Sequence, residues 1–198
     1  REQASVLSEA IEEAGGEPLE FPTIRVVEPE DYAPLDRAIG ELNTFDWIIF
    51  TSVNGVQAFF QRLRHHCKDV RELYRARLCA IGPKTREALE NYGLLVETVP
   101  GEYRAEKIIE ALRDKVAAGT KILLPRADIA RKVLPEALKQ MGANVTEVTA
   151  YRTVAGNGDS ARVREMLKHG EIHLVTFTSS STVHNLVKML NAPNLEAL

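Results

Sequence analysis

Two stretches of this chain share one sequence pattern, and together they restrict the fold more than any other feature. Residues 47–56 read WIIFTSVNGV, and residues 174–183 read LVTFTSSSTV. Each begins as an apolar run that ends in Phe-Thr-Ser, which is typical of a strand buried on both faces. The Thr, Ser and Asn residues that follow are types that cap the start of a helix. The chain is therefore predicted to build the same strand-to-helix turn twice.

The two turns lie 127 residues apart, and the same offset aligns other parts of the chain. Residues 6–10 then fall on residues 133–137, and Gly15 falls on Gly142. Separate blocks that match at one offset indicate two similar α/β lobes. The alternative is a chance match, because strand–helix units are repetitive by nature.

Composition places the chain among ordinary globular proteins. It has 198 residues, of which 44% are hydrophobic and 27% are charged, enough for one large domain or two small ones. No apolar run is long enough to span a bilayer and no signal stretch opens the chain, so we expect a cytoplasmic protein that does not bind membranes. The formal net charge is −3 with scattered Lys and Arg, which argues against nucleic acid as a partner.

Cysteine and histidine do not form a recognisable metal site. Cys67 and Cys79 are the only cysteines, and their spacing fits neither a disulfide framework nor a structural zinc site. His65, His66 and Cys67 are adjacent, but neighbouring residues on a helix point about 100° apart and do not readily share one ion. We expect no metal at this tract.

Short apolar runs alternate with amphipathic stretches from residue 47 onward. Strands are predicted at 47–51, 77–81, 95–99, 120–124, 145–150 and 172–177, with helices at 83–92, 104–117 and 128–141. Since Pro135 would break a helix interior, the last of these helices is expected to become regular only near Leu134. Strands separated by helices pair in parallel through right-handed crossovers. The predicted fold class is α/β, with two similar doubly wound parallel-sheet lobes.

Two extended segments interrupt this rhythm and indicate how the lobes are connected. Residues 21–29 carry two prolines, and residues 148–154 are their counterpart in the repeat. If both cross between lobes, the chain begins in lobe one, builds all of lobe two and then returns. The predicted boundaries are 1–24 with 155–198 for the discontinuous lobe one, 29–150 for lobe two, and 25–28 with 151–154 for the connectors.

Lobe one is expected to be incomplete at both ends. In lobe two a strand at 122–126 precedes the repeated helix, whereas the first copy opens directly at Arg1. Lobe two also continues into an Ile-Gly-Pro unit at 81–83, and the sequence stops at Leu198 before any equivalent. We therefore expect the parent protein to contain further residues.

An ordered set of short motifs runs through the chain. They are FTSVNGV at 50–56, AIGPKT at 80–85 with Gly93-Leu94, LPR at 124–126 with Leu134-Pro135, and AYRT at 150–153. In this order they resemble the uroporphyrinogen-III synthase family, and the resemblance covers essentially the whole chain. It implies two α/β lobes joined by a two-stranded connector, with a cleft between them.

The resemblance also implies a reaction of haem, sirohaem and cobalamin biosynthesis, catalysed by a lyase. The linear tetrapyrrole hydroxymethylbilane loses water, ring D is inverted, and the macrocycle closes as uroporphyrinogen III. No cofactor and no metal are implied. The expected protein is a monomer with this small-molecule substrate, and in some organisms the family is fused to a uroporphyrinogen-III methyltransferase.

A polycarboxylate substrate must be bound locally, because the protein is slightly acidic overall. Helix N-termini at 52–56, 82–85, 126–129 and 179–183 offer free N–H groups at the carboxyl edges of the sheets. The predicted substrate-binding residues are Thr51, Ser52, Asn54, Gly55, Val56, Gly82, Pro83, Lys84, Thr85, Arg126, Thr178, Ser179, Ser180 and Ser181. The alternative for the hydroxyl and amide residues is helix capping alone, for Gly55 and Gly82 turn geometry, and for Lys84 and Arg126 a solvated surface charge.

Tyr151 is the catalytic residue that the resemblance favours, as the group that assists departure of the hydroxyl. It ends a buried strand, and a phenol is protonated at neutral pH and can donate. The alternative is an aromatic plug at a hinge with its hydroxyl in water. Most of the catalysis is expected to come from holding a near-attack shape and from stabilising the azafulvenium and spiro intermediates.

Two other kinds of protein share parts of this pattern. A two-lobed binding protein for a polycarboxylate or tetrapyrrole, without catalysis, fits the repeat and the crossings equally well. A flavodoxin-like regulatory module needs an acidic pocket at a strand end, and Asp46 and Asp128 are not arranged that way. The ordered motifs favour the synthase.

Overall fold

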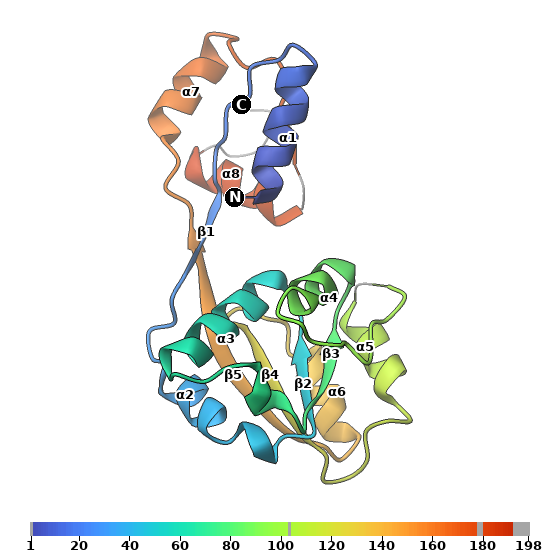
Figure 1. The fold of residues 1–198 in the computed structure, drawn as a ribbon. Helices are drawn as coiled ribbons and strands as arrows, with labels where there is room; N and C mark the ends of the chain where they lie inside the picture. Colours follow the sequence, from blue (N-terminus) through green and yellow to red (C-terminus); the bar gives the residue numbers. More distant parts are fainter. Residues whose placement is uncertain (1, 103, 178–179, 192–198) are drawn as a thin grey trace. The chain divides into compact units, whose positions relative to one another are not determined.

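A computed structural model describes residues 2–102, 104–177 and 180–191 (Figure 1). The chain divides into two compact units. Unit 1 comprises residues 1–25 and 154–198, and unit 2 comprises residues 26–153.

The described residues contain one five-stranded sheet, with strand order β1-β5-β4-β2-β3. β2 (Trp47–Phe50) lies between β4 (Lys121–Ala127) and β3 (Arg77–Ala80) and is parallel to both. β4 is also parallel to β5 (Asn144–Ala155), and β1 (Ile24–Val27) adjoins β5 at the edge. The division between the two units falls within both β1 and β5. The fold is α/β with a mostly parallel sheet.

Helices cover both faces of the sheet in unit 2. They are α2 (Ala33–Gly40), α3 (Val53–His65), α4 (Pro83–Glu90), α5 (Ala105–Leu112) and α6 (Val133–Gln140), with short 3₁₀ turns at Leu42–Thr44 and Val70–Leu73. Successive residues of a strand point to opposite faces. Accordingly, Ile48 and Phe50 pack in one buried cluster with α2, α3 and α4, whereas Trp47 and Ile49 pack in another with α5 and α6. Unit 2 is thus a doubly wound sheet with two cores.

Unit 1 has a much smaller core. Its helices are α1 (Glu2–Glu13), α7 (Ser160–Lys168) and α8 (Ser180–Met189). Among the described residues, its buried cluster contains Val163, Leu186 and Leu190. The described residues of unit 1 therefore bury far less apolar surface than those of unit 2.

The strand predicted at 172–177 does not form, so the expectation of a second doubly wound sheet is wrong for the described residues. Leu174 is 80% exposed and Val175 is 45% exposed, in a segment without strand pairing. A strand needs neighbours that pair its backbone N–H and C=O groups. In unit 2 these neighbours are β4 and β3, which lie on either side of β2. Their counterparts in the repeat would lie 127 residues before β4 and 127 residues after β3, and both positions fall outside residues 1–198.

Most other elements form close to the predicted positions, with differences that have local causes. The predicted strand at 95–99 is reduced to a single bridge between Thr98 and Cys79. The helix predicted at 104–117 ends at Leu112. α6 begins at Val133, so Pro135 lies in the first helical turn, where a missing N–H costs no helical bond. Helix α2 was not predicted.

Parts of the internal repeat are visible in the structure. Residues 6–10 and 133–137, which align in sequence, both lie in helices. The glycines that follow these helices, Gly15 and Gly142, have φ values of 83° and 89°. Both therefore adopt the left-handed conformation that glycine favours after a helix.

Candidate active site

The carboxyl edge of the sheet in unit 2 gathers most of the predicted site residues. Because β2, β3 and β4 are parallel, the chain leaves all three strands at this edge. The backbone N–H of Ile81 donates to the Phe50 carbonyl at 3.0 Å, which holds the first two of these exits side by side. The residues brought to this edge are Thr51, Ser52, Asn54 and Gly55 at the start of α3, Gly82, Pro83, Lys84 and Thr85 at the start of α4, and Arg126 near the end of β4.

Ser52 forms the start of α3. Its backbone is extended, and its Oγ accepts a hydrogen bond of 3.0 Å from the Gly55 N–H. The Ser52 carbonyl accepts the Val56 N–H at 3.2 Å. This is the capping arrangement that the sequence predicted as one alternative for Ser52. The N–H groups of Val53 and Asn54 belong to the first turn, where a helix offers them no internal partner.

Tyr151 meets the same serine. Its hydroxyl lies 3.0 Å from the Ser52 Oγ, although the two residues are 99 positions apart. The pairing of β4 with β5 shifts its register after Arg126, so Ala127 lies opposite Tyr151 and Ala150 is passed over. Such an irregularity redirects a side chain. Consecutive Ala150 and Tyr151 consequently both pack in the cluster on the α3 side of the sheet.

Gly55 allows α3 to approach this point closely. A Cβ atom at position 55 would lie 3.1 Å from the Ser52 Oγ and 3.2 Å from the Pro125 carbonyl oxygen. It would also lie 3.9 Å from Cε1 of Tyr151. The absence of a side chain at this position therefore preserves the spacing between the cap, β4 and the tyrosine.

The turn before α4 offers different chemistry. Gly82 has an extended backbone and Pro83 is the first helical residue, a position that suits proline. The Lys84 side chain is 74% exposed and forms an ion pair of 2.9 Å with Glu87. Thr85, in contrast, is buried. Among these residues, Lys84 is the one whose charge is open to solvent.

Arg126 is buried rather than solvated, which overturns one of the alternatives for this residue. It is 6% exposed, and burial lowers the pKa of its guanidinium group. Its Nη1 donates to Glu147 Oε2 at 3.0 Å, and its Nη2 donates to the Arg131 carbonyl at 2.5 Å. The other Glu147 oxygen accepts from Lys132 at 2.6 Å. Arg126 thus holds the turn that leads into α6.

The remaining predicted site residues differ in their placement. Val56 is fully buried, so its side chain packs in the core of unit 2 and stabilises the turn. Thr51 is half-buried and Asn54 is exposed. Thr178 and Ser179 lie outside the described residues, and Ser180 and Ser181 begin α8.

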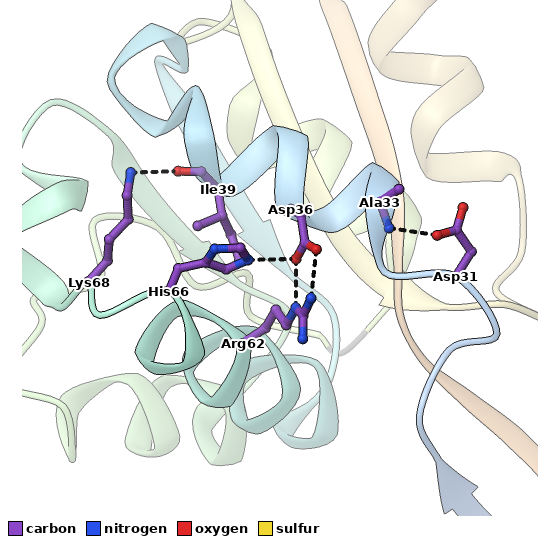
Figure 2. Close-up of polar contacts among 7 residues, drawn as sticks. All are labelled: Asp31, Ala33, Asp36, Ile39, Arg62, His66 and Lys68. Atoms are coloured by element: carbon purple, nitrogen blue, oxygen red, sulfur yellow. Dashed lines mark hydrogen bonds and ion pairs between the residues drawn. The ribbon is translucent and has the colours of Figure 1, made fainter.

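A second polar cluster, which the sequence analysis missed, ties α2 to α3 (Figure 2). Arg62 donates to both carboxylate oxygens of Asp36, with each distance 2.6 Å, and the His66 Nε2 lies 2.8 Å from Asp36 Oδ1. The Arg62 guanidinium holds the pKa of Asp36 well below its usual range. Asp36 lies 26 positions from Arg62 and 30 positions from His66, so no local motif indicated the cluster.

No metal centre or membrane segment was found in the part of the chain that the structure describes. No cluster of three or more His, Cys, Asp or Glu residues there could hold a metal ion. His66 is engaged with Asp36, and both cysteines are free thiols. No helix among these residues is both long and apolar enough to cross a membrane.

The geometry is that of an α/β protein that binds a small ligand. Two helix N-termini, a serine–tyrosine hydroxyl pair and a buried guanidinium meet at the carboxyl edge of a parallel sheet, where α/β proteins bind small ligands. The donors suit an anionic small molecule.

Comparisons with known proteins identify the family. The family described as uroporphyrinogen-III synthase HemD matches residues 5–198. A putative uroporphyrinogen-III synthase of Methanothermobacter thermautotrophicus is 36% identical over 190 residues, covering 95% of this chain and 74% of that protein. The porphyrin biosynthesis protein HemD of Ruminiclostridium josui is 30% identical over 198 residues, and this chain spans 39% of its length.

A solved structure supports the fold. A crystal structure of a mutant uroporphyrinogen III synthase from Thermus thermophilus matches with a TM-score of 0.67 at 22% identity, covering 96% of this chain and 74% of that one. This chain belongs to the uroporphyrinogen-III synthase family, the hydro-lyases of tetrapyrrole biosynthesis. The resemblance that the motifs indicated is confirmed.

Proposed function

We propose that this chain converts hydroxymethylbilane to uroporphyrinogen III and that the carboxyl edge of unit 2 supplies the proton for the departing hydroxyl. The observation that carries the proposal is the placement of the Tyr151 hydroxyl, 3.0 Å from the Ser52 Oγ at the start of α3. Tyr151 is only 8% exposed, so its phenol has few water molecules as competing partners. Within the described residues of the predicted site, it is the group best suited to act as a general acid.

The reaction consumes a proton when water departs and releases a proton after the macrocycle has closed. When the C–O bond of the hydroxymethyl group breaks, the electron pair stays with oxygen, the phenol proton joins it, and water departs. The electron-rich pyrrole stabilises the resulting cation, which limits what the acid must contribute. After ring D has been inverted and the macrocycle has closed, a ring carbon loses its proton and the phenolate takes it up. The tyrosine thus finishes in its starting state.

Binding is proposed to rely on local donors. The net charge of −3 gives no general attraction for a polycarboxylate. Exposed Asn54 and Lys84, half-buried Thr51, and the N–H groups at the starts of α3 and α4 are available to carboxylates. Buried Arg126 and Val56 are proposed to stabilise the turns at this edge. The turn at Thr178, Ser179, Ser180 and Ser181 stays a prediction.

The predicted organisation is retained as a proposal. Unit 1 is proposed to be the counterpart of unit 2, with lobe boundaries at 1–24 and 155–198, and at 29–150. The support is the sequence repeat itself, in which helix α1 corresponds to helix α6 and Gly15 corresponds to Gly142, both glycines having a left-handed backbone conformation. A cytoplasmic monomer without a cofactor, and fusion to a methyltransferase in some relatives, rest on the family resemblance alone.

The test is the Tyr151→Phe variant, which keeps the ring and removes the hydroxyl. We expect the rate of uroporphyrinogen III formation to fall by about one to two orders of magnitude, as for loss of a modest general acid. Tyr74→Phe is the matched control, because Tyr74 is 76% exposed and precedes β3, whose opposite end lies at the site edge. The control is expected to keep the wild-type rate. An unchanged rate for Tyr151→Phe would overturn the acid role.

A further inference from the structure

The Ser52 hydroxyl lies between two hydrogen-bond partners with different requirements. The Gly55 N–H can only donate, so the Ser52 Oγ must be the acceptor of that bond, at 3.0 Å. The Tyr151 hydroxyl, also at 3.0 Å, can either donate or accept. A serine hydroxyl has one proton and two lone pairs, so both directions are chemically open.

The direction of the second bond decides whether the tyrosine can act as an acid. If Tyr151 donates to Ser52, its proton is used inside the protein. If Ser52 donates to Tyr151, the phenol proton is free to point at the substrate. Only the second arrangement is compatible with proton transfer to a leaving hydroxyl.

The same bond becomes stronger as the reaction proceeds. After the phenol has lost its proton, its oxygen is an anion that can only accept. The Ser52 O–H then makes a charge-assisted hydrogen bond, which is stronger than the neutral bond in the resting enzyme. An interaction that strengthens in the transition state raises turnover rather than substrate affinity.

The start of α3 reinforces this effect. The Gly55 N–H withdraws electron density from the Ser52 Oγ, which makes its proton a better donor. The positive end of the α3 dipole lies at the same place and favours an anion there. Gly55 itself keeps the approach open, since a Cβ at this position would lie 3.1 Å from the Ser52 Oγ.

We propose that Ser52 is a positioning residue that donates its proton to the Tyr151 oxygen, rather than a ligand for a substrate carboxylate. In this role it turns the phenol proton toward the leaving hydroxyl and stabilises the phenolate that remains. The role rests on the proposed function of Tyr151 as the acid. It assigns one serine two tasks, to cap α3 and to direct the proton of the tyrosine.

Three substitutions separate these tasks. Ser52→Ala removes both the acceptor for Gly55 and the donor for Tyr151. Ser52→Asp keeps an acceptor that caps helices well, but an ionised carboxylate has no proton to donate. Ser52→Thr keeps both functions, and its extended backbone suits a β-branched residue. A control for capping alone is Asp159→Ala, because Asp159 caps α7 through an equivalent 3.0 Å bond from the Arg162 N–H and is not one of the predicted site residues.

The measurements are kcat and KM for uroporphyrinogen III formation, together with the unfolding temperature of each variant. We expect Ser52→Asp to unfold near the wild-type temperature while kcat falls about tenfold or more and KM stays within about threefold. Ser52→Thr should recover most of the lost turnover, and Asp159→Ala should lower the unfolding temperature without changing kcat. A raised KM at constant kcat in Ser52→Ala and Ser52→Asp would instead identify a substrate ligand and overturn the proposal.

The Tyr151→Phe background distinguishes failure of this inference from failure of the proposed function. If Ser52 acts through Tyr151, adding Ser52→Ala to Tyr151→Phe should reduce kcat little further. If Tyr151→Phe leaves kcat unchanged, the acid role itself fails. If Tyr151→Phe lowers kcat, and Ser52→Ala lowers kcat by the same factor in the Tyr151→Phe background as in the wild type, the acid role stands and the positioning role is contradicted.

Discussion

The two Phe-Thr-Ser segments show how far one sequence pattern can diverge in structure. In unit 2, residues 47–50 form β2, and all four side chains are buried. In unit 1, residues 174–177 form no strand, and Leu174 is 80% exposed. The local sequences are nearly interchangeable, so the cause of the difference lies in what surrounds them.

The surroundings of β2 are two parallel strands and helices on both faces. β4 and β3 pair its backbone on either side, and the two cores cover its alternate side chains. Residues 174–177 have no such neighbours in the described structure. An apolar run therefore specifies a strand only when the rest of the chain provides its pairing partners.

The largest effect that tests this comparison comes from the same substitution in both copies. Phe50 is fully buried against Phe59 and Phe60, whereas its counterpart Phe177 is 38% exposed. Phe50→Ala is expected to lower the free energy of unfolding by about 3–5 kcal/mol. Phe177→Ala is expected to lower it by less than about 1 kcal/mol. Urea denaturation of both variants measures the difference, and equal losses would show that the two segments are packed alike.

A second pair of substitutions compares the glycines that end the repeated helices. Gly15 and Gly142 both have a positive φ, so alanine at either position is strained by about 1 kcal/mol. Only at Gly142 would the new Cβ also press against the protein, at 3.0 Å from the Ala118 Cα. Gly142→Ala should therefore be the more destabilising of the two. Thermal unfolding decides the order, and a greater loss for Gly15→Ala would contradict the described packing.

The smallest expected effect concerns acid stability. The pKa of Asp36 is depressed in the folded state by Arg62, so this carboxylate stabilises the fold above its unfolded pKa of about 3.9. That contribution, about 1 kcal/mol for a pair exposed to this degree, is lost progressively as the pH falls from about 5 through the depressed pKa of the folded state.

The matched comparison for acid stability uses the Asp36→Asn and Glu165→Gln variants. Asp36→Asn should unfold more readily than wild type at neutral pH and approach wild-type stability in acid. Glu165 forms an ion pair with Lys168 in which both side chains are largely exposed, so Glu165→Gln should show no measurable difference at either pH. A constant difference between Asp36→Asn and wild type across this range would mean that charge is not the cause.

The sequence was sufficient where local chemistry decides the structure. The strands of unit 2 follow from apolar runs, and the start of α6 near Leu134 follows from the restriction that Pro135 imposes. It failed where an outcome depends on distant partners. Residues 172–177 have the composition of a strand without the neighbours, and α2 is stabilised by packing in the core of unit 2.

The candidate site shows the same division. The positions of Ser52 and Gly82 before helices were predictable from capping and turn chemistry. The bond between Ser52 and Tyr151 was not, because it joins residues 99 positions apart and depends on the irregular pairing of β5 with β4. Burial of Arg126 was equally hidden, since its partner Glu147 lies on another strand.

The most direct test of the central claim is the isomer of the product. The protein, expressed from its complete natural gene, is incubated with enzymatically generated hydroxymethylbilane, and the uroporphyrinogen isomers are separated by chromatography after oxidation. Our account predicts mainly type III product, at a rate that Tyr151→Phe lowers by about one to two orders of magnitude. Type I product alone, as formed without an enzyme, would contradict the account and favour a protein that only binds a polycarboxylate or tetrapyrrole.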